Sequence, residues 1–255
     1  MDRWRGRTAL VTGASSGIGL AAAETLARQG MNVIGCARNL EKIEALNNTL
    51  PKGSGTVRAI KCDITKEEDI KRMFAEIEKT HKHVDVLVNN AGMAKTDTLV
   101  TGSADQWREM IDVNVMGLSI CAREALRLMT KDQITDGHII NINSMAGHAV
   151  PPWATAHFYS ATKHMVIALT EALYREVKEI SKKIRVTSIS PGGVQTDFGN
   201  RWVGEENVKK LALSGSGMKL LEAQDIADAI AYVVNAPPHV CIKELIIAPT
   251  EQPAM

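Results

Sequence analysis

A tyrosine and a lysine lie four residues apart in the stretch His157-Phe-Tyr-Ser-Ala-Thr-Lys-His164. At this spacing, Tyr159 and Lys163 would share one face of a helix. A fixed ammonium beside a phenol stabilises the phenolate and lowers the pKa of the phenol. Free tyrosine titrates near pH ~10, so acid–base work near neutrality needs a shift of roughly 3 units, equivalent to about 4 kcal/mol. An ordinary surface helix can carry the same pair, so the rest of the chain has to decide between the two interpretations.

A glycine-rich turn follows the first predicted strand. Residues 12–19 read Thr-Gly-Ala-Ser-Ser-Gly-Ile-Gly, and an alanine-rich helical pattern comes next. Glycines at 13, 17 and 19 allow a tight turn and a close approach of backbone to phosphate. The helix start then presents free N–H groups and a positive dipole end to a pyrophosphate. Because it lies between a strand and a helix, this turn predicts a dinucleotide site, whereas elsewhere it would indicate only a loop.

The end of the second predicted strand bears on which dinucleotide is bound. NAD-binding proteins of this design place a carboxylate there, which accepts from the ribose 2′-hydroxyl. Here the strand end reads Cys36-Ala-Arg-Asn39, without a carboxylate at the tip. The Arg38 guanidinium can bind a 2′-phosphate, which a carboxylate would repel, and Ser16 can donate a further hydrogen bond. We therefore expect NADP(H) in preference to NAD(H), with a solvated arginine as the alternative.

Two further strand ends carry small and polar residues. Asp63 follows the third predicted strand, and Asn89-Asn-Ala-Gly92 follows the fourth. The carboxyl ends of parallel strands form the edge where ligands bind. There Asp63 can accept from an adenine amino group, and the small residues let the backbone approach an adenosine. The competing interpretation of Asp63 is a helix N-cap.

Ser144 and Asn114 complete the polar candidates. Ser144 ends the fifth predicted strand fifteen residues before Tyr159 (159 − 144 = 15), so the strand end and the helix start can face one crevice. Asn114 lies inside a long helical stretch, where asparagine is unfavourable because its amide competes with the backbone. With Gly117 three residues on, we expect a local kink with an inserted water. A polar residue on a solvated helix face is the alternative.

These residues need a scaffold in which strand ends converge, and the hydrophobic pattern predicts one. Short apolar runs predict strands at 8–11, 32–36, 57–61, 85–88, 138–142, 185–189 and 244–247. Helical patterns lie between them at 17–29, 41–50, 66–80, 104–130, 155–180 and 223–235. This alternation predicts right-handed βαβ units and a doubly wound parallel sheet of about seven strands, an α/β Rossmann fold with helices on both faces. We expect a single domain over residues 1–255, with the glycine-rich region 192–222 as a substrate-binding lid.

Composition limits the partners. Hydrophobic residues make up 45% and charged residues 23% of the 255, which is ordinary globular usage. The net charge of +1 gives no general attraction to nucleic acid or anionic membrane. No apolar run approaches the ~20 residues that span a bilayer, and we expect no signal peptide because a strand pattern follows the first few residues. Four separated cysteines indicate reduced thiols, and the seven histidines show no metal-ligand spacing. We expect a cytoplasmic protein without a metal site.

Taken together, the motifs resemble those of the single-domain short-chain dehydrogenase/reductase family. They appear in order and span almost the whole chain: Thr12-Gly-x-x-x-Gly-x-Gly19, Asn89-Asn-Ala-Gly92, Asn114, Ser144, Tyr159-x-x-x-Lys163 and Pro191-Gly-x-x-x-Thr196. Within the family, the chain resembles the insect farnesol dehydrogenases and a vertebrate carbonyl and ketosteroid reductase. This finer likeness rests on stretches that begin at Met1, Val33, Gly137, His157 and Pro249.

The resemblance implies an oxidoreductase that uses NADP(H). Tyr159 would be the general acid in reduction and the base in oxidation, with Lys163 lowering its pKa and binding the nicotinamide ribose. Ser144 would hold the substrate oxygen. Asn114 would complete a proton relay through a water, and Thr196 would fix the nicotinamide. The implied cofactor contacts are Gly13, Ser15, Ser16, Gly17, Ile18, Gly19, Arg38, Asn39, Asp63, Ile64, Asn90, Ala91, Gly92, Tyr159, Lys163, Pro191, Gly192, Val194 and Thr196.

The implied substrate is a hydrophobic alcohol or ketone, such as a farnesol-type isoprenoid alcohol or a ketosteroid. Apolar residues suit such a pocket, with core packing as the alternative: Met145, Trp153, Phe158, Phe198 and Trp202. The loop 150–153 is expected to form one pocket wall, because the serine–tyrosine interval is slightly longer than is commonest in the family. The resemblance also implies a homodimer or homotetramer. Two alternatives stay open: a reductase of small reactive carbonyls such as diketones and quinones, and a non-catalytic NADP-sensing protein.

Overall fold

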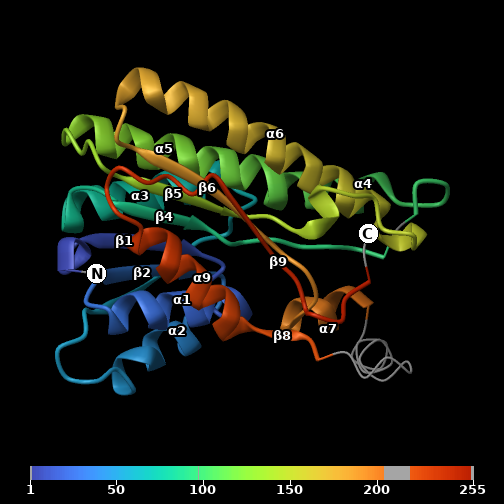
Figure 1. Ribbon diagram of the computed structural model, residues 1–255, viewed down its shortest axis with the longest axis horizontal. Helices are drawn as coiled ribbons and strands as arrows, with labels where there is room; N and C mark the ends of the chain where they lie inside the picture. The colour runs from blue at the N-terminus through green and yellow to red at the C-terminus, as the bar shows by residue number, and fades with distance from the viewer. Residues whose placement is uncertain (1, 97, 204–218, 254–255) are drawn as a thin grey trace.

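A seven-stranded parallel sheet forms the centre of the protein (Figure 1). The computed structural model describes residues 2–96, 98–203 and 219–253. The strands of the sheet are β1 (Thr8–Thr12), β2 (Asn32–Ala37), β3 (Val57–Lys61), β4 (Val86–Asn89), β5 (His138–Ile142), β6 (Arg185–Pro191) and β9 (Glu244–Ile247). Their spatial order is β3-β2-β1-β4-β5-β6-β9. The order reverses between β1 and β4, so the ligand crevice of a doubly wound sheet lies outside the carboxyl ends of these two strands.

Helices cover both faces of the sheet. The α-helices are α1 (Gly17–Arg28), α2 (Glu41–Ala45), α3 (Glu67–His81), α4 (Ala104–Ile111), α5 (Leu118–Lys131), α6 (His157–Ile180), α7 (Asp197–Val203) and α9 (Ala223–Asn235). Short 3-10 turns occur at η1 (Asp2–Trp4), η2 (Leu46–Asn48), η4 (Met145–Gly147) and η5 (Ala154–Ala156). In Figure 1, α1, α2 and α9 lie on one side of the sheet, and α3, α5 and α6 on the other. The predicted fold class is confirmed.

The core has two apolar layers, one on each face of the sheet. Strand β1 is buried along its whole length, and its Val11 and Leu10 point into different layers. This alternation follows from the two-residue period of a strand. Leu26 of α1 belongs to the layer of Val11, and Phe74 of α3 to the layer of Leu10. A strand that is buried on both faces reads as a continuous apolar run, which is why β1 was visible in the sequence.

The chain is helical over the predicted stretch 104–130, but the helix is distorted near Asn114, where a local kink was expected. Between α4 and α5 the chain makes a π-helical stretch, η3 (Asp112–Gly117). A Cβ at Gly117 would lie 2.7 Å from the backbone oxygen of Ile64, so this glycine lets the helix run against the neighbouring loop. The distortion that Asn114 and Gly117 indicated therefore takes the form of a widened turn.

One helix boundary that differs is the start of α6. The prediction began at residue 155, but Ala154–Ala156 form a 3-10 turn and the α-helix begins at His157. Tyr159 therefore lies in the first turn of α6. The helix predicted over 41–50 is also shorter, since the α-helical part ends at Ala45 and a 3-10 turn follows.

The predicted lid region 192–222 is described only at its two ends. At those ends, β7 (Val194–Gln195) pairs in parallel with β8 (Leu221–Glu222), and α7 follows β7 directly. The middle of the predicted lid, residues 204–218, lies outside the described residues. Among the helices that are described, none is long and apolar enough to cross a membrane. In the same part of the chain, His, Cys, Asp and Glu side chains form no group of three or more that could hold a metal ion.

Candidate active site

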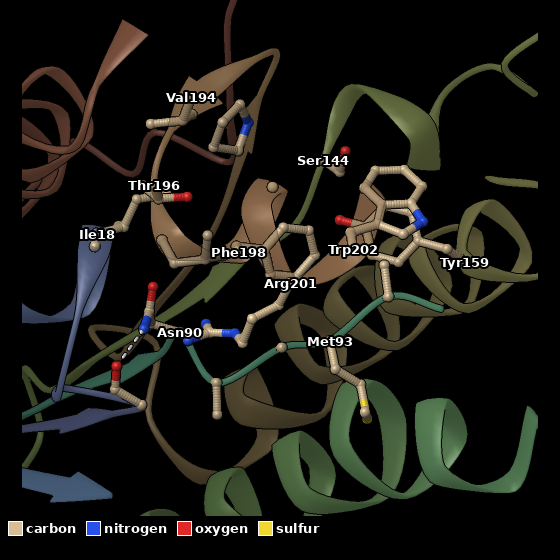
Figure 2. Close-up of a pocket in the computed structure, with 18 of the residues that line it drawn as sticks. Ile18, Asn90, Met93, Ser144, Tyr159, Val194, Thr196, Phe198, Arg201 and Trp202 are labelled. Atoms are coloured by element: carbon tan, nitrogen blue, oxygen red, sulfur yellow. Dashed lines mark hydrogen bonds between the residues drawn. The ribbon is translucent and has the colours of Figure 1, made fainter. Parts of the chain in front are cut away.

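A cavity of about 1040 Å³ lies at the carboxyl ends of the strands. Figure 2 shows residues from the glycine turn, the β4 end, the β5 end, α6 and α7 facing it. Most of the predicted site residues line it: Gly13, Ser15, Ser16, Gly17, Ile18, Arg38, Asp63, Ile64, Asn90, Ala91, Gly92, Ser144, Tyr159, Lys163, Pro191, Gly192, Val194 and Thr196. Three predicted residues are not among its lining residues: Gly19, Asn39 and Asn114.

The glycine turn is shaped by close backbone contacts. Gly13 and Gly17 have φ angles of +66° and +53°, which favour glycine. A Cβ at Gly13 would lie 2.9 Å from the Ala91 Cα atom, and one at Gly17 would lie 3.1 Å from the Thr196 side chain. Ser16 is the N-cap of α1 and, within the described residues, makes no side-chain capping bond. The turn therefore leaves the start of α1 facing the cavity, which fits a bound diphosphate.

Gly19 supports this turn from behind. A Cβ at Gly19 would lie 2.4 Å from the Asn90 amide nitrogen and 2.4 Å from the Gly13 oxygen. That nitrogen donates to the Thr12 oxygen at 2.9 Å and to the Gly13 oxygen at 3.2 Å. Asn90 thus holds the glycine turn to the end of β4, and Gly19 makes room for it.

The far end of the cavity carries Arg38 and Asp63. Arg38 is exposed, and in the part of the chain that the structure describes it has no ion-pair partner. One carboxylate oxygen of Asp63 accepts from the backbone and the hydroxyl of Thr65, at 3.1 and 2.8 Å. The Asn39 side chain accepts from the N–H of Glu41, the first residue of α2, at 3.1 Å. A dinucleotide whose adenosine half lies here would meet a guanidinium that is free to bind phosphate.

Tyr159 and Lys163 are both buried at the opposite end of the cavity. The Lys163 ammonium lies 5.8 Å from the centroid of the Tyr159 ring and donates to the Ile142 oxygen at 3.0 Å. Burial raises the pKa of Tyr159 to about 12, although its hydrogen bond with Ser144 opposes the rise. Burial also lowers the pKa of Lys163 to about 8.

The expected lowering of the Tyr159 pKa by Lys163 is therefore not found in this structure. The physical reason is desolvation, which disfavours the phenolate more strongly than the surrounding polar groups favour it. Two rings of α7 contribute to the burial of Tyr159. Its ring centroid lies 5.1 Å from that of Trp202 and 5.9 Å from that of Phe198.

Asn114 lies behind the cavity and binds backbone. Its Oδ1 atom accepts from the Met93 N–H at 2.8 Å, and its Nδ2 atom donates to the Met93 oxygen at 2.8 Å. Nδ2 also donates to the Thr162 hydroxyl at 3.0 Å, and that hydroxyl in turn donates to the backbone oxygen of Tyr159 at 2.7 Å. The widened turn of η3 thus joins the segment after β4 to the first turn of α6.

Known proteins with similar sequences identify the family of this chain. The family model for short chain dehydrogenases matches residues 7–207. The chain belongs to this family. As a short-chain dehydrogenase/reductase it is an oxidoreductase, and the resemblance seen in the sequence is confirmed.

Two curated relatives match this short-chain dehydrogenase over nearly its full length. The "Dehydrogenase/reductase SDR family member 11" of Bos taurus is 49% identical over 254 residues, which is 99% of each chain. The "Farnesol dehydrogenase" of Aedes aegypti is 45% identical over 251 residues, which is 98% of each chain.

Solved structures also match this short-chain dehydrogenase. A serine dehydrogenase complexed with NADP+ is 31% identical, with a TM-score of 0.85 over 97% of this chain and 96% of that one. An alcohol dehydrogenase from the archaeon Thermococcus sibiricus, complexed with 5-hydroxy-NADP, is 26% identical, with a TM-score of 0.84 over 98% of this chain and 100% of that one.

Of the apolar pocket residues predicted for this short-chain dehydrogenase, four line the cavity: Met145, Trp153, Phe198 and Trp202. Phe158 does not, because it stacks on Trp107 with ring centroids 5.0 Å apart. The loop 150–153 contributes Trp153 and two prolines to the wall.

Gln252 and Arg201 line the cavity although the sequence did not single them out. Gln252 accepts from the Gly193 N–H at 2.9 Å and donates to the Met145 sulfur at 3.4 Å, so it joins two cavity walls. The signal that could have found Gln252 was the family-like ending that begins at Pro249. Arg201 lies on α7, a helix that the sequence pattern did not predict.

Proposed function

We propose that this short-chain dehydrogenase interconverts a hydrophobic alcohol and its carbonyl compound with NADP(H). The observation that supports the proposal is a single cavity with two unlike ends. One end offers Ser144 and Tyr159 beneath the rings of Phe198 and Trp202, and the other offers the glycine turn and Arg38.

NADP(H), when bound, supplies or accepts the hydride. The residues of the chain move the proton and place the substrate. Tyr159 would give its phenolic proton to the carbonyl oxygen during reduction and would take it back during oxidation. Because burial holds the pKa of Tyr159 at about 12, the phenol of the free protein is protonated at neutral pH, which is the form that reduction needs.

The residues around Tyr159 would support this proton transfer. Ser144 would hold the substrate oxygen through its hydroxyl. Lys163, with a pKa of about 8, is mainly protonated at neutral pH and would pass a proton toward the phenol. Asn114 would act by position, since its amide fixes Met93 and Thr162, and the relay water expected near Lys163 stays part of the proposal.

A Tyr159→Phe protein tests the proposal directly. It should still bind NADPH and lose turnover of every carbonyl substrate. Persisting turnover would contradict the role of the phenol. The wild-type protein should be assayed with farnesol plus NADP+ and with a ketone panel plus NADPH. Activity on small diketones or quinones alone would favour the alternative substrate class. Binding of NADPH without any turnover would favour a sensor.

The preference for NADP(H) is proposed from Arg38. It is an exposed cation at the cavity edge, where a 2′-phosphate can accept two parallel hydrogen bonds. An Arg38→Gln protein should lose about 10- to 100-fold in affinity for NADPH, and its affinity for NADH should stay within about twofold. Equal losses for both, or a wild-type preference for NADH, would refute the assignment.

We further propose a cytoplasmic homodimer or homotetramer that folds as one domain, with 192–222 as its lid. The four thiols are free, which suits a reducing compartment. Met165 on α6 and Ile246 on β9 are exposed apolar side chains that an interface between copies would cover. Light scattering of the purified protein tests the oligomer, and a monomer at micromolar concentration would refute it.

A further inference from the structure

The charged side chains that line the cavity differ in whether they have an ion-pair or hydrogen-bond partner. Six charged side chains line it: Arg38, Asp63, Lys95, Glu109, Lys163 and Arg201. Lys95 and Glu109 form an ion pair with 2.9 Å between nitrogen and oxygen. Lys163 donates to a backbone oxygen, and Asp63 accepts from Thr65. With Arg38 proposed for the 2′-phosphate, Arg201 is the cavity cation that neither the described contacts nor the proposed function uses.

The position of Arg201 is set by the turn that precedes α7. Thr196, which lies between β7 and α7, packs against the glycine turn. A Cβ at Gly17 would lie 3.1 Å from the Thr196 side chain. Helix α7 therefore begins beside the place proposed for the diphosphate. Arg201 lies one helical turn after Asp197, yet among the described residues it forms no ion pair with Asp197 or any other carboxylate.

The side chain of Arg201 extends into the cavity. Figure 2 shows it reaching from α7 across the cavity, in the direction of Asn90, while Phe198 and Trp202 lie toward Tyr159. Arg201 is an exposed residue, and it lines the cavity. A guanidinium in this position offers a planar fork of donors that matches a phosphate or a carboxylate.

We infer that Arg201 binds an anionic oxygen group inside the cavity, on the side toward which its side chain extends. The group is a phosphate or a carboxylate. Its two sources are the diphosphate bridge of the dinucleotide and an acidic group on the substrate. This inference rests on the proposed function, since it takes the cavity as the shared site of dinucleotide and substrate.

The same contact orders the cover over the catalytic tyrosine. Trp202 follows Arg201 directly, and its ring centroid lies 5.1 Å from that of Tyr159. An anion held by Arg201 fixes the helix that carries Trp202. Arg201 is therefore a ligand-binding residue whose contact also positions the aromatic cover.

The test measures binding, so that it does not depend on turnover. The wild type, Arg201→Gln and Arg201→Lys are titrated with NADPH, NADH and 2′,5′-ADP, which lacks the diphosphate bridge and the nicotinamide. A ketone that carries a carboxylate and its methyl ester are then titrated in the presence of NADP+. Arg28→Gln on α1, an exposed arginine paired with Glu24, is the control for the loss of one positive charge.

Two results support the inference and separate the sources. If the diphosphate is the ligand, Arg201→Gln weakens NADPH and NADH about 10- to 100-fold, weakens 2′,5′-ADP less because that compound keeps only one phosphate of the bridge, and Arg201→Lys recovers part of the loss. If the substrate is the source, the Kd values of the dinucleotides do not change in Arg201→Gln. The binding of the carboxylate ketone then weakens by that factor relative to the binding of its methyl ester. In either case the wild-type Kd rises with salt more steeply than that of Arg201→Gln.

The inference is overturned if all these Kd values, and the acid-to-ester ratio, stay within about twofold of the wild type. Circular dichroism checks that the variant is folded, which is expected because Arg201 is exposed. A wild type without any carbonyl turnover would refute the proposed function and leave the binding result for Arg201 intact.

Discussion

Replacing Lys163 by methionine should make the protein more stable and inactive. Burial lowers the pKa of Lys163 from 10.5 to about 8, so the folded protein disfavours the charged ammonium. This lowering of the pKa corresponds to about 3 kcal/mol at neutral pH, where the lysine is mainly charged in both states. Methionine removes this penalty but also removes the hydrogen bond to the Ile142 oxygen, which contributes about 1 kcal/mol. The expected net gain in unfolding free energy is about 2 kcal/mol.

The pH dependence of the unfolding free energy tests whether Lys163 destabilises the folded state. Because the pKa is lower in the folded state, the unfolded chain binds more protons between pH 8 and 10.5. The unfolding free energy contributed by Lys163 therefore rises with pH across this window, and it is lowest below pH 8. The methionine variant lacks that rise, so its advantage should shrink between pH 8 and 10.5 and reverse above it.

Urea unfolding of the dinucleotide-free protein, followed by circular dichroism at one protein concentration and several pH values, measures both quantities. Lys42→Met on α2 is the matched control, because Lys42 is exposed and its replacement should change stability by less than about 0.5 kcal/mol. A Lys163→Met protein that is less stable than the wild type at pH 7, or whose stability follows a parallel pH curve, would refute the reasoning.

Trp202→Ala should expose Tyr159 to water and move its pKa from about 12 toward the ordinary value of 10. Ultraviolet titration of the phenolate, with a Tyr159→Phe background subtracted, measures the shift, and an unchanged midpoint would show that Trp202 does not control the burial. Asn114→Leu should destabilise the protein by about 3 kcal/mol, because it leaves the Met93 N–H and oxygen without a bond and removes the donor to the Thr162 hydroxyl. A loss below about 1 kcal/mol in urea unfolding would contradict this account.

The parts of the fold that sequence reasoning reached are those with a strong period or a fixed neighbour. The strand His138–Ile142 was predicted at its true ends because it is buried throughout and bounded by polar residues. The same holds for Ala223–Asn235, whose apolar face packs on α1. The glycine turn could be placed because it must follow the first strand and open the first helix.

The parts that it missed depend on contacts between distant segments. Asn114 and Gly117 indicated a distortion of this helix, but not that it takes the form of the π-helical stretch Asp112–Gly117, in which Asn114 binds the backbone of Met93. The pKa of Tyr159 was expected to fall because Lys163 is close in sequence, but the rings of α7 bury the phenol. Gln252 is near the end of the sequence, and it lies at the site because it bonds to Gly193 and Met145, which are distant from it in the sequence.

Arg38 and Lys163 differ in how much their replacement would change the stability of the fold. Arg38 lies at the exposed edge of the cavity and, within the described residues, supports no ion pair, so its replacement disturbs no packing. Lys163 is buried, and the folded state holds its charge at a cost in stability. If Arg38 sets the dinucleotide preference as proposed, that preference can drift by single substitutions during evolution at little loss of folding free energy. If Lys163 serves turnover as proposed, it persists only under selection for turnover, because relaxed selection would favour its loss.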